Sequence, residues 1–162
     1  MLLCCNKVIE NEEPEGQAPM TSQPTAVAAG SRRAENEAVV RRYCDAWSRG
    51  DLPAIVDCYH DELVLHYFGR SPLAGEHRGK AAALGVLARV QQLTNRRLLA
   101  IEDVLASDDR AVVLARERFE RDGRVLEARR VLVYRVRDGR IAEGWIYDED
   151  QRAVDEFWES AP

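Results

Sequence analysis

Few side chains in this sequence could move a proton near neutral pH. His60, His66 and His77 are its three histidines, and an unperturbed histidine titrates close to the physiological range. His66 lies in a short apolar run that is typical of a strand, on the opposite face from Tyr67. A single-residue bulge would turn it toward the face of Tyr67. We therefore keep His66 as a candidate ligand contact.

The cysteines do not have the spacing of a metal site. Cys4 and Cys5 are adjacent, whereas Cys44 and Cys58 stand alone within predicted helices. No C-x-x-C pair and no Cys/His pair with zinc-site spacing is present in the sequence. We expect reduced thiols, no bound metal and no cofactor.

Two charged residues interrupt apolar strand patterns. Glu117 and Arg130 fall on predicted neighbouring strands, and an unpaired charge on an apolar sheet face would be costly. We expect Glu117 to pair with Arg130 or to reach the rim of a pocket. Other arginines alternate with acidic residues, as in the segment 116–122, which is typical of a self-paired, solvated surface.

These side chains must be positioned by helices that fill most of the first half of the chain. Apolar residues from Val39 to Trp47 recur at i, i+3, i+4 and i+7, which predicts an amphipathic helix that Gly50 ends. Asp51 offers an N-cap for a second helix, with Pro53 in its first turn. The predicted helices are residues 35–50, 51–59 and 79–90.

The second half of the chain has the pattern of an antiparallel meander. A short β-branched and aromatic run, Leu63–Phe68, predicts a first strand before a Gly- and Pro-containing loop. Turn residues at 108–109, 122–123 and 138–139 separate further apolar runs. The meander strands are predicted at 97–106, 111–121, 124–137 and 140–147, followed by a closing helix or tail at 151–159.

The composition describes one soluble globular domain with a polar leader. Residues 1–33 lack a regular apolar pattern, so we expect a disordered leader of unassigned role, with Met20 as an alternative start, and a folded domain at residues 34–162. Acidic residues outnumber basic ones by 28 to 23, which disfavours nucleic acid. No apolar run has the length of a membrane span, and no secretion signal is seen, so we expect a cytoplasmic protein.

The order helix, helix, strand, helix, meander predicts an α+β fold in which helices cover one face of a strongly bent sheet. The concave mouth of such a sheet is a common site for a pocket with an apolar lining. We therefore expect the domain to bind a small apolar molecule.

Several segments give this chain a family resemblance. It resembles the nuclear transport factor 2-like superfamily over about residues 35–158, and more narrowly its SnoaL-like and ketosteroid isomerase branches. The resemblance implies a cone-shaped, antiparallel-rich sheet wrapped by three N-terminal helices. The segments that carry it are 39–43, 48–56, 71–75 with 78–79, 134–141 and 145–148.

The resemblance also assigns roles to single residues. Tyr43 occupies the position of the tyrosine with which the isomerases stabilise an oxyanion. The isomerase base falls on Tyr67, and the second oxyanion donor falls on Leu132, so neither is retained. Asp148 stands where SnoaL-like cyclases place an acid/base aspartate. The inward-facing strand residues implied by the same alignment are 63, 65, 67, 113, 115, 117, 119, 130, 132, 134, 144, 146 and 148.

Each candidate also has a structural interpretation. Asp148 could cap the following helix from the acidic run 148–150, and Tyr43 and Trp47 could be core aromatics. We take Asp148 and Tyr43 as candidate catalytic residues. The candidate substrate-binding residues are Trp47, Tyr67, His66, Val86, Val90, Phe119, Leu132 and Ile146.

Two functions remain open on the sequence. One is cofactor-independent acid–base chemistry, of a cyclase or isomerase, on a polyketide-, steroid- or terpenoid-like substrate. The other is a non-catalytic ligand-binding or dimerisation module of the same fold. The resemblance implies a homodimer through the convex sheet face, where Ile141, Trp145 and Tyr147 are expected to point outward.

Overall fold

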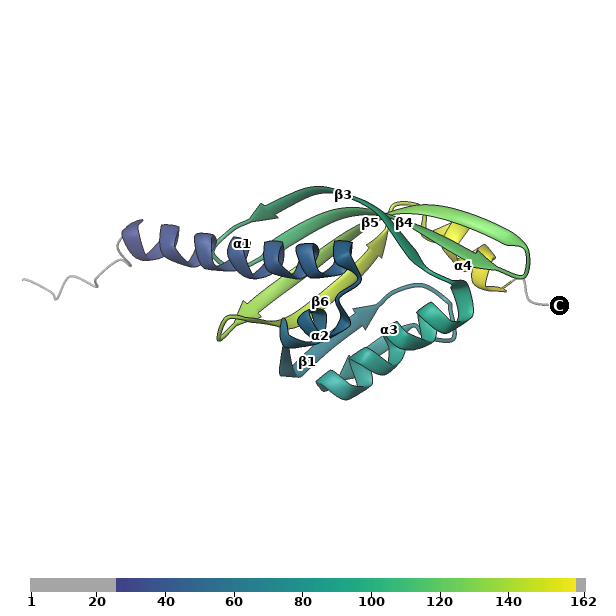
Figure 1. Cartoon of the computed structure of the whole chain (residues 1–162), viewed down its shortest axis with the longest axis horizontal. Helices are drawn as coiled ribbons and strands as arrows, with labels where there is room; N and C mark the ends of the chain where they lie inside the picture. Colours follow the sequence, from purple (N-terminus) through teal and green to yellow (C-terminus); the bar gives the residue numbers. More distant parts are fainter. Residues whose placement is uncertain (1–25, 160–162) are drawn as a thin grey trace, which may run out of the picture.

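The fold is a strongly curved six-stranded sheet with helices on its concave side (Figure 1). The computed structural model describes residues 26–159. The strand order is β2-β1-β6-β5-β4-β3, and every neighbouring pair is antiparallel except β1 with β6. The elements are α1 (Ala26–Arg49), α2 (Leu52–Asp57), β1 (Tyr59–Tyr67), β2 (Gly75–Arg78), α3 (Lys80–Thr94), β3 (Arg97–Ala106), β4 (Ala111–Arg121), β5 (Arg124–Arg137), β6 (Arg140–Asp148) and α4 (Gln151–Glu159).

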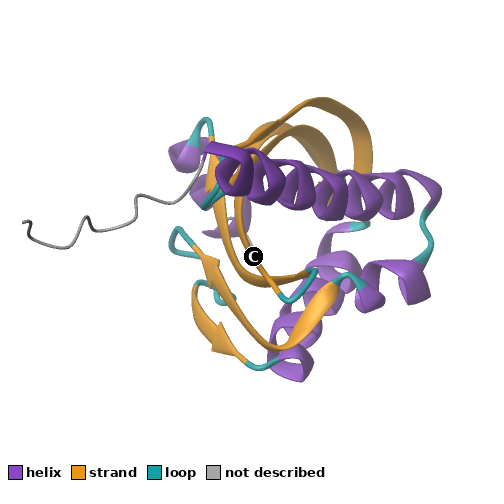
Figure 2. Cartoon of the chain, turned by 90° about the vertical axis from the view of Figure 1, so that its left-hand side faces the viewer, coloured by secondary structure: helices purple, strands orange, loops and turns teal. Residues whose placement is uncertain are grey.

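The helices begin and end where local chemistry allows. The Asp51 carboxylate accepts a hydrogen bond from the Ala54 backbone N–H at 3.1 Å, which caps α2 as predicted. Helix α3 ends at Asn95, whose left-handed backbone (φ 39°) is a conformation that asparagine tolerates. Helix α1 packs along the sheet against β3, and α3 packs against β1 (Figures 1 and 2). The helices therefore enclose the concave face that the sequence predicted to be covered.

The meander follows its prediction closely because its turns and alternation are regular. Asp122-Gly123 and Asp138-Gly139 all have positive φ, as two-residue hairpin turns require. Strands β4 and β5 pair without a register shift, so side chains alternate strictly between the two faces. Every residue predicted to face inward is buried, apart from Asp148, which is intermediate as a whole residue but has an exposed side-chain fraction of only 1%.

A bulge in β6 overturns one predicted orientation. Arg135 pairs with Glu143 whereas Val136 pairs with Ile141, so β6 contains one extra residue at this point. Because of this extra residue, the side chains at the start of β6 point to the opposite face from the one that strict alternation predicts. Ile141 was expected on the convex face and is instead fully buried.

The first half of the chain differs more from its prediction. Helix α1 already begins at Ala26, so residues 26–33 are helical rather than part of a disordered leader, while residues 1–25, including Met20, lie outside the described residues. Strand β1 begins at Tyr59, which was expected to end a helix, because α2 stops at Asp57. The short strand β2 was not predicted.

Two cysteines lie in the described part of the chain. Cys44 and Cys58 are both buried and free. Burial, and then the neighbouring Asp45, raises the pKa of the Cys44 thiol to about 12. Because the thiolate is the reactive form, Cys44 is expected to be unreactive. None of the helices between residues 26 and 159 combines the length and the hydropathy needed to cross a membrane.

We predict that Gly69→Ala lowers the free energy of unfolding by about 2 kcal/mol. Gly69 has φ +98°, and an added Cβ would lie 2.5 Å from Asp155 Oδ1 on α4. The matched control is Gly85→Ala in α3, where an added Cβ meets no atom within 4 Å, so stability should rise by about 0.5–1 kcal/mol. Urea unfolding of both variants measures the difference, and equal midpoints would contradict the assigned packing.

Candidate functional site

An apolar pocket of about 430 Å³ opens between the three helices that cover the sheet. It has the size and the lining of a small-molecule site. Arg96, which follows α3, is the single charged residue among those that line it, and Gln91 and Gln92 are the other polar ones apart from the aromatic residues. We name it the outer pocket, and it is lined by Tyr43, Trp47, Leu52, Ile55, Val56, Tyr59, Leu84, Leu87, Ala88, Gln91, Gln92 and Arg96.

A second, much smaller cavity lies next to the outer pocket. It holds about 20 Å³, which is room for one water molecule or one ligand hydroxyl. Two strands supply Glu117 and Arg130 to its lining, so the polar groups gather here rather than in the outer pocket. We name it the inner cavity, and its lining residues are Tyr43, Trp47, Tyr59, Leu65, Leu87, Arg96, Glu117, Arg130, Leu132, Tyr134 and Ile146.

The two cavities share part of their walls, which makes them successive parts of one site. Tyr43 and Trp47 from α1, Tyr59 from β1, Leu87 from α3 and Arg96 line both. A ligand in the outer pocket therefore lies against the groups that border the inner cavity.

Three tyrosines form one wall of this site. The ring centroid of Tyr43 lies 5.5 Å from those of both Tyr59 and Tyr134. Burial raises the pKa of all three well above the usual value for tyrosine, and the neighbouring tyrosines add to the effect. Their hydroxyls therefore stay protonated at physiological pH and can donate hydrogen bonds.

Arg130 is the centre of a buried polar network behind the inner cavity. Its guanidinium donates to both oxygens of Asp148, at 2.7 and 3.2 Å, to Glu117 Oε2 at 3.1 Å, and to the Tyr67 hydroxyl at 3.0 Å. Burial alone would lower the pKa of Arg130, but Tyr67, Glu117 and Asp148 together raise it above its usual value. The guanidinium is therefore charged, and the predicted pairing of Glu117 with Arg130 is confirmed.

Glu117 connects this network to the cavity. Its second oxygen, Oε1, lies 3.2 Å from Arg96 Nε, within ion-pair distance, but the geometry is not that of a hydrogen bond, and Oε1 is buried without a hydrogen-bond partner. Arg96 and Arg130 balance Glu117 and Asp148 in charge. The site is thus electrically neutral and contains one unused acceptor.

Four of the candidate residues line the cavities. Tyr43 and Trp47 face both, and Leu132 and Ile146 face the inner cavity. Tyr59 and Arg96 also line the site but were missed: Tyr59 was placed in a helix, and Arg96 lies in a short link between elements. The family alignment, combined with the alternation of side chains along the strands, is the signal that did identify Glu117 and Arg130.

Asp148, Tyr67 and Phe119 lie behind Arg130 rather than on either cavity wall. Both Asp148 oxygens are occupied by Arg130, and the Arg130 guanidinium carbon lies 5.3 Å from the Tyr67 ring centroid and 5.2 Å from that of Phe119. The structure therefore gives these three residues contacts with Arg130 and none with the cavities. Asp148 does not cap α4 either, since the Ala153 N–H donates to Asp150.

His66, Val86 and Val90 are also placed away from the cavities. His66 stacks on Trp145 at 5.2 Å and hydrogen-bonds Glu143 at 3.0 Å on the outer side of the sheet. The register shift of β1 against β6 lies before Val64, and the regular pairing from Val64 to Tyr67 keeps His66 on the face opposite Tyr67. Val86 and Val90 are buried in the core, whereas the neighbouring stripe of α3 that contains Leu84, Leu87 and Gln91 lines the outer pocket. One step of the helical repeat separates the two stripes.

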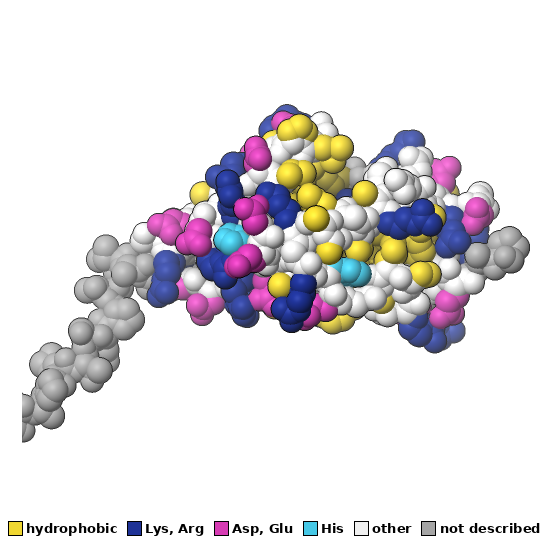
Figure 3. Space-filling model, turned by 90° about the horizontal axis from the view of Figure 1, so that it is seen from below, with side chains coloured by type: hydrophobic (Ala, Val, Ile, Leu, Met, Phe, Trp, Pro, Cys, Tyr) yellow, Lys and Arg dark blue, Asp and Glu magenta, His cyan; other side chains and the backbone are white. Residues whose placement is uncertain are grey.

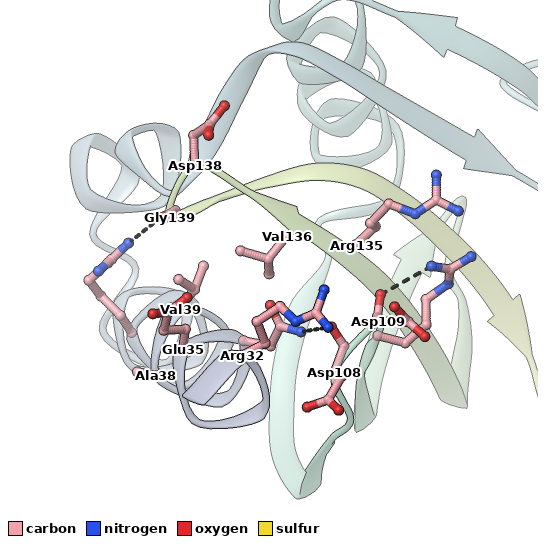
Figure 4. Close-up of a pocket in the computed structure, with 13 residues that line it drawn as sticks. Arg32, Glu35, Ala38, Val39, Asp108, Asp109, Arg135, Val136, Asp138 and Gly139 are labelled. Atoms are coloured by element: carbon pink, nitrogen blue, oxygen red, sulfur yellow. Dashed lines mark hydrogen bonds between the residues drawn. The ribbon is translucent and has the colours of Figure 1, made fainter. Parts of the chain in front are cut away.

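A further hollow on the molecule is lined mainly by charged residues. It has a volume of about 650 Å³ and is bordered by Arg32, Glu35, Asp108, Asp138 and their neighbours, with charges of both signs (Figure 4). Acidic and basic side chains also alternate over the face shown in Figure 3. Within residues 26–159, no three His, Cys, Asp or Glu side chains gather into a group that could hold a metal ion.

Comparison with known proteins places this chain in a family. Residues 40–144 match the SnoaL-like domain, so the chain belongs to the SnoaL-like family, and its α+β cone is the fold of the nuclear transport factor 2-like superfamily. The resemblance and the fold class expected from the sequence are thereby confirmed.

Individual relatives agree with this assignment. The uncharacterized protein Rv0034 of Mycobacterium tuberculosis is 33% identical over 124 residues, which cover 74% of this chain and 93% of that protein. Bal32a, from a soil-derived mobile gene cassette, is similar in structure, with a TM-score of 0.73 and 30% identity over 79% of this chain and 99% of that chain. TerC, co-crystallized with polyporic acid, has a TM-score of 0.67 and 21% identity over 78% of this chain and 99% of that chain, and shows the shared fold.

We predict that Asp148→Asn lowers the free energy of unfolding by about 3 kcal/mol, because it leaves the buried Arg130 charge partly uncompensated. The control is Glu149→Gln, the next residue along the chain, whose side chain is 64% exposed and whose ion pair with Arg129 spans 3.9 Å, so its effect should stay below about 0.5 kcal/mol. Chemical denaturation measures both. A stable Asp148→Asn protein would show that the Arg130 network does not hold the site together.

Proposed function

We propose that this protein binds a small, largely apolar molecule of polyketide-, steroid- or terpenoid-like character in the outer pocket and carries out cofactor-independent acid–base chemistry on it, as a cyclase or isomerase does. The observation that carries the proposal is the continuity of the apolar outer pocket with an inner cavity lined by ionisable groups. An apolar wall with a few convergent polar groups is the usual form of such a site. That TerC, a protein of the same fold, was co-crystallized with polyporic acid is consistent with a ligand of this size.

Tyr43 is the proposed oxyanion donor. It lines both cavities and keeps its proton because burial raises its pKa. A protonated hydroxyl in a water-poor site can donate to the oxygen of a carbonyl as negative charge develops on it. The proton removed next to that carbonyl would go to the Glu117 carboxylate, which lines the inner cavity and has one oxygen without a hydrogen-bond partner among the described residues. Its return from Glu117 to another atom of the ligand would complete an isomerisation or a ring closure.

The role proposed for Asp148 follows from its position. Its carboxylate is separated from the inner cavity by Arg130, which occupies both oxygens. Asp148 is therefore proposed as a positioning residue that fixes the Arg130 guanidinium, and the carboxylate that borders the cavity is that of Glu117.

A non-catalytic binding protein is the second candidate. It is favoured because both carboxylate oxygens of Asp148 already accept hydrogen bonds from Arg130. It is also favoured because Tyr67 and Leu132 stand where the isomerases have their base and their second oxyanion donor. The two candidates share the pocket and differ in turnover. Conversion of a bound compound, followed by mass spectrometry, separates them.

We predict that Ala88→Trp abolishes the thermal stabilisation that polycyclic aromatic, steroid or terpenoid compounds give to the unaltered protein. Ala88 is an exposed residue of α3 that lines the outer pocket, so an indole there would fill the pocket without disturbing the core. A ligand at one hundred times its Kd stabilises a protein by about 2.7 kcal/mol, which a thermal-shift screen detects.

The matched control is Ala82→Trp, an exposed position of the same helix that lines neither cavity. It should keep every hit. Absence of any hit with the unaltered protein, or hits that survive Ala88→Trp, would count against the outer pocket as a binding site.

A homodimer through the convex sheet face is also part of the proposal. Phe68 and Tyr147 stack there at 4.7 Å with 38% and 43% of their surfaces exposed, and Trp145 lies in the same row of β6. Such an aromatic row is favourable to bury in a twofold interface.

We predict that Tyr147→Lys converts a dimer to a monomer in size-exclusion chromatography with light scattering, because it places a charge within the apolar row. Leu105→Lys, at a residue that is 51% exposed on the sheet-edge strand β3, should leave the mass unchanged. A monomeric unaltered protein would refute the dimer.

A further inference from the structure

We infer that the inner cavity receives the hydroxyl group of a neutral, otherwise apolar ligand, with the hydroxyl donating to Glu117 Oε1 and accepting from Arg96. This inference rests on the proposed binding function and specifies which polar group the ligand carries and which end of it enters first.

The first observation is the unused acceptor. Glu117 has an exposed fraction of 1%, lines the inner cavity, and its Oε1 makes no hydrogen bond within the described residues. Leaving a buried acceptor unsatisfied is unfavourable, and charged acceptors are costlier than neutral ones. A ligand that brings a donor to this point would regain that free energy.

Second, the carboxylate cannot turn to satisfy itself. Its other oxygen accepts from Arg130 Nη1 at 3.1 Å, and Arg130 is in turn fixed by two hydrogen bonds to Asp148. Oε1 is therefore held in place before a ligand arrives, which is the arrangement that lowers the cost of binding.

The third observation is an unused donor beside the acceptor. Arg96 lines both cavities, lies over the Trp47 ring at 5.7 Å, and is ion-paired with Glu117, yet its guanidinium donates no hydrogen bond within residues 26–159. An acceptor and a donor thus stand next to each other at the junction of the cavities.

These two groups select among polar ligands. A hydroxyl both donates and accepts, so it can satisfy Glu117 and Arg96 together. A carboxylate can only accept and would face the charge of Glu117, an ammonium can only donate and would face Arg96, and an ether leaves Glu117 without a donor. The balanced charges of the site favour a neutral group, and the inner cavity has room for no more than one such oxygen.

The test uses three naphthalene probes that differ in one substituent: 2-naphthol, 2-fluoronaphthalene, whose fluorine is close in size to a hydroxyl but cannot donate a hydrogen bond, and 2-naphthoate. All three are titrated at pH 7 by calorimetry. We expect 2-naphthol to bind about tenfold more tightly than either of the others, the effect of one hydrogen bond to a charged group. Equal affinity of the naphthol and the fluoro compound, or tightest binding of the naphthoate, would overturn the inference while leaving the pocket as a binding site. If none of the three binds, the proposed function itself fails.

Glu117→Gln locates the effect. Because Arg130 needs an acceptor, the amide is expected to turn its oxygen toward Arg130 and its NH₂ toward the cavity. The naphthol then has no acceptor for its proton and should bind within about twofold of the fluoro compound. Glu127→Gln, on the exposed side of β5, should keep the tenfold preference. A preference retained in Glu117→Gln would overturn the assignment, and if that variant does not fold, the three affinities of the unaltered protein decide alone.

Discussion

The ion-pair network around Arg130 is the constraint on which the site depends. A guanidinium with 1% exposure is tolerated only because Asp148, Glu117 and Tyr67 all accept from it. Arg130 lies on β5 and these partners lie on β6, β4 and β1, so the network joins four neighbouring strands of the curved sheet. Within residues 26–159, the buried carboxylate oxygen left without a hydrogen bond belongs to Glu117, a residue that lines the inner cavity.

The meander could be predicted because its turns and its alternation of side chains are regular. Where a strand contains an extra residue, the prediction from the sequence was wrong. The family alignment set the inward face, and the alternation along β4 and β5 then identified Glu117, Arg130 and Leu132 as inward-facing, because no bulge interrupts these strands. Ile141 was assigned to the wrong face because one extra residue in β6 leaves no mark in its composition. The start of β1 was missed for a related reason, since the apolar spacing up to Tyr59 suits a helix and tertiary pairing with Ile141 decides otherwise.

The site itself was predicted only in part. The family alignment, extended by helical and strand periodicity, placed Tyr43, Trp47, Leu132 and Ile146 at the site, and they line the cavities. Val86 and Val90 lie one stripe away from the wall of α3. Two features of the site depend on distances between side chains of different strands: Arg130 donates hydrogen bonds to Asp148, and Glu117 Oε1 has no hydrogen-bond partner in the described part of the chain. No spacing along the sequence contains those distances.

The parallel pairing of β1 with β6 determines when β1 can join the meander. Tyr59 lies beside Ile141 in this pair, so the first strand of the sheet finds its place only after nearly the whole chain is available. Contacts between residues so distant in sequence form slowly. During synthesis, β1 can take its place beside β6 only after residues 140–148 have emerged, so the part of the sheet that joins β1 to the meander is completed late.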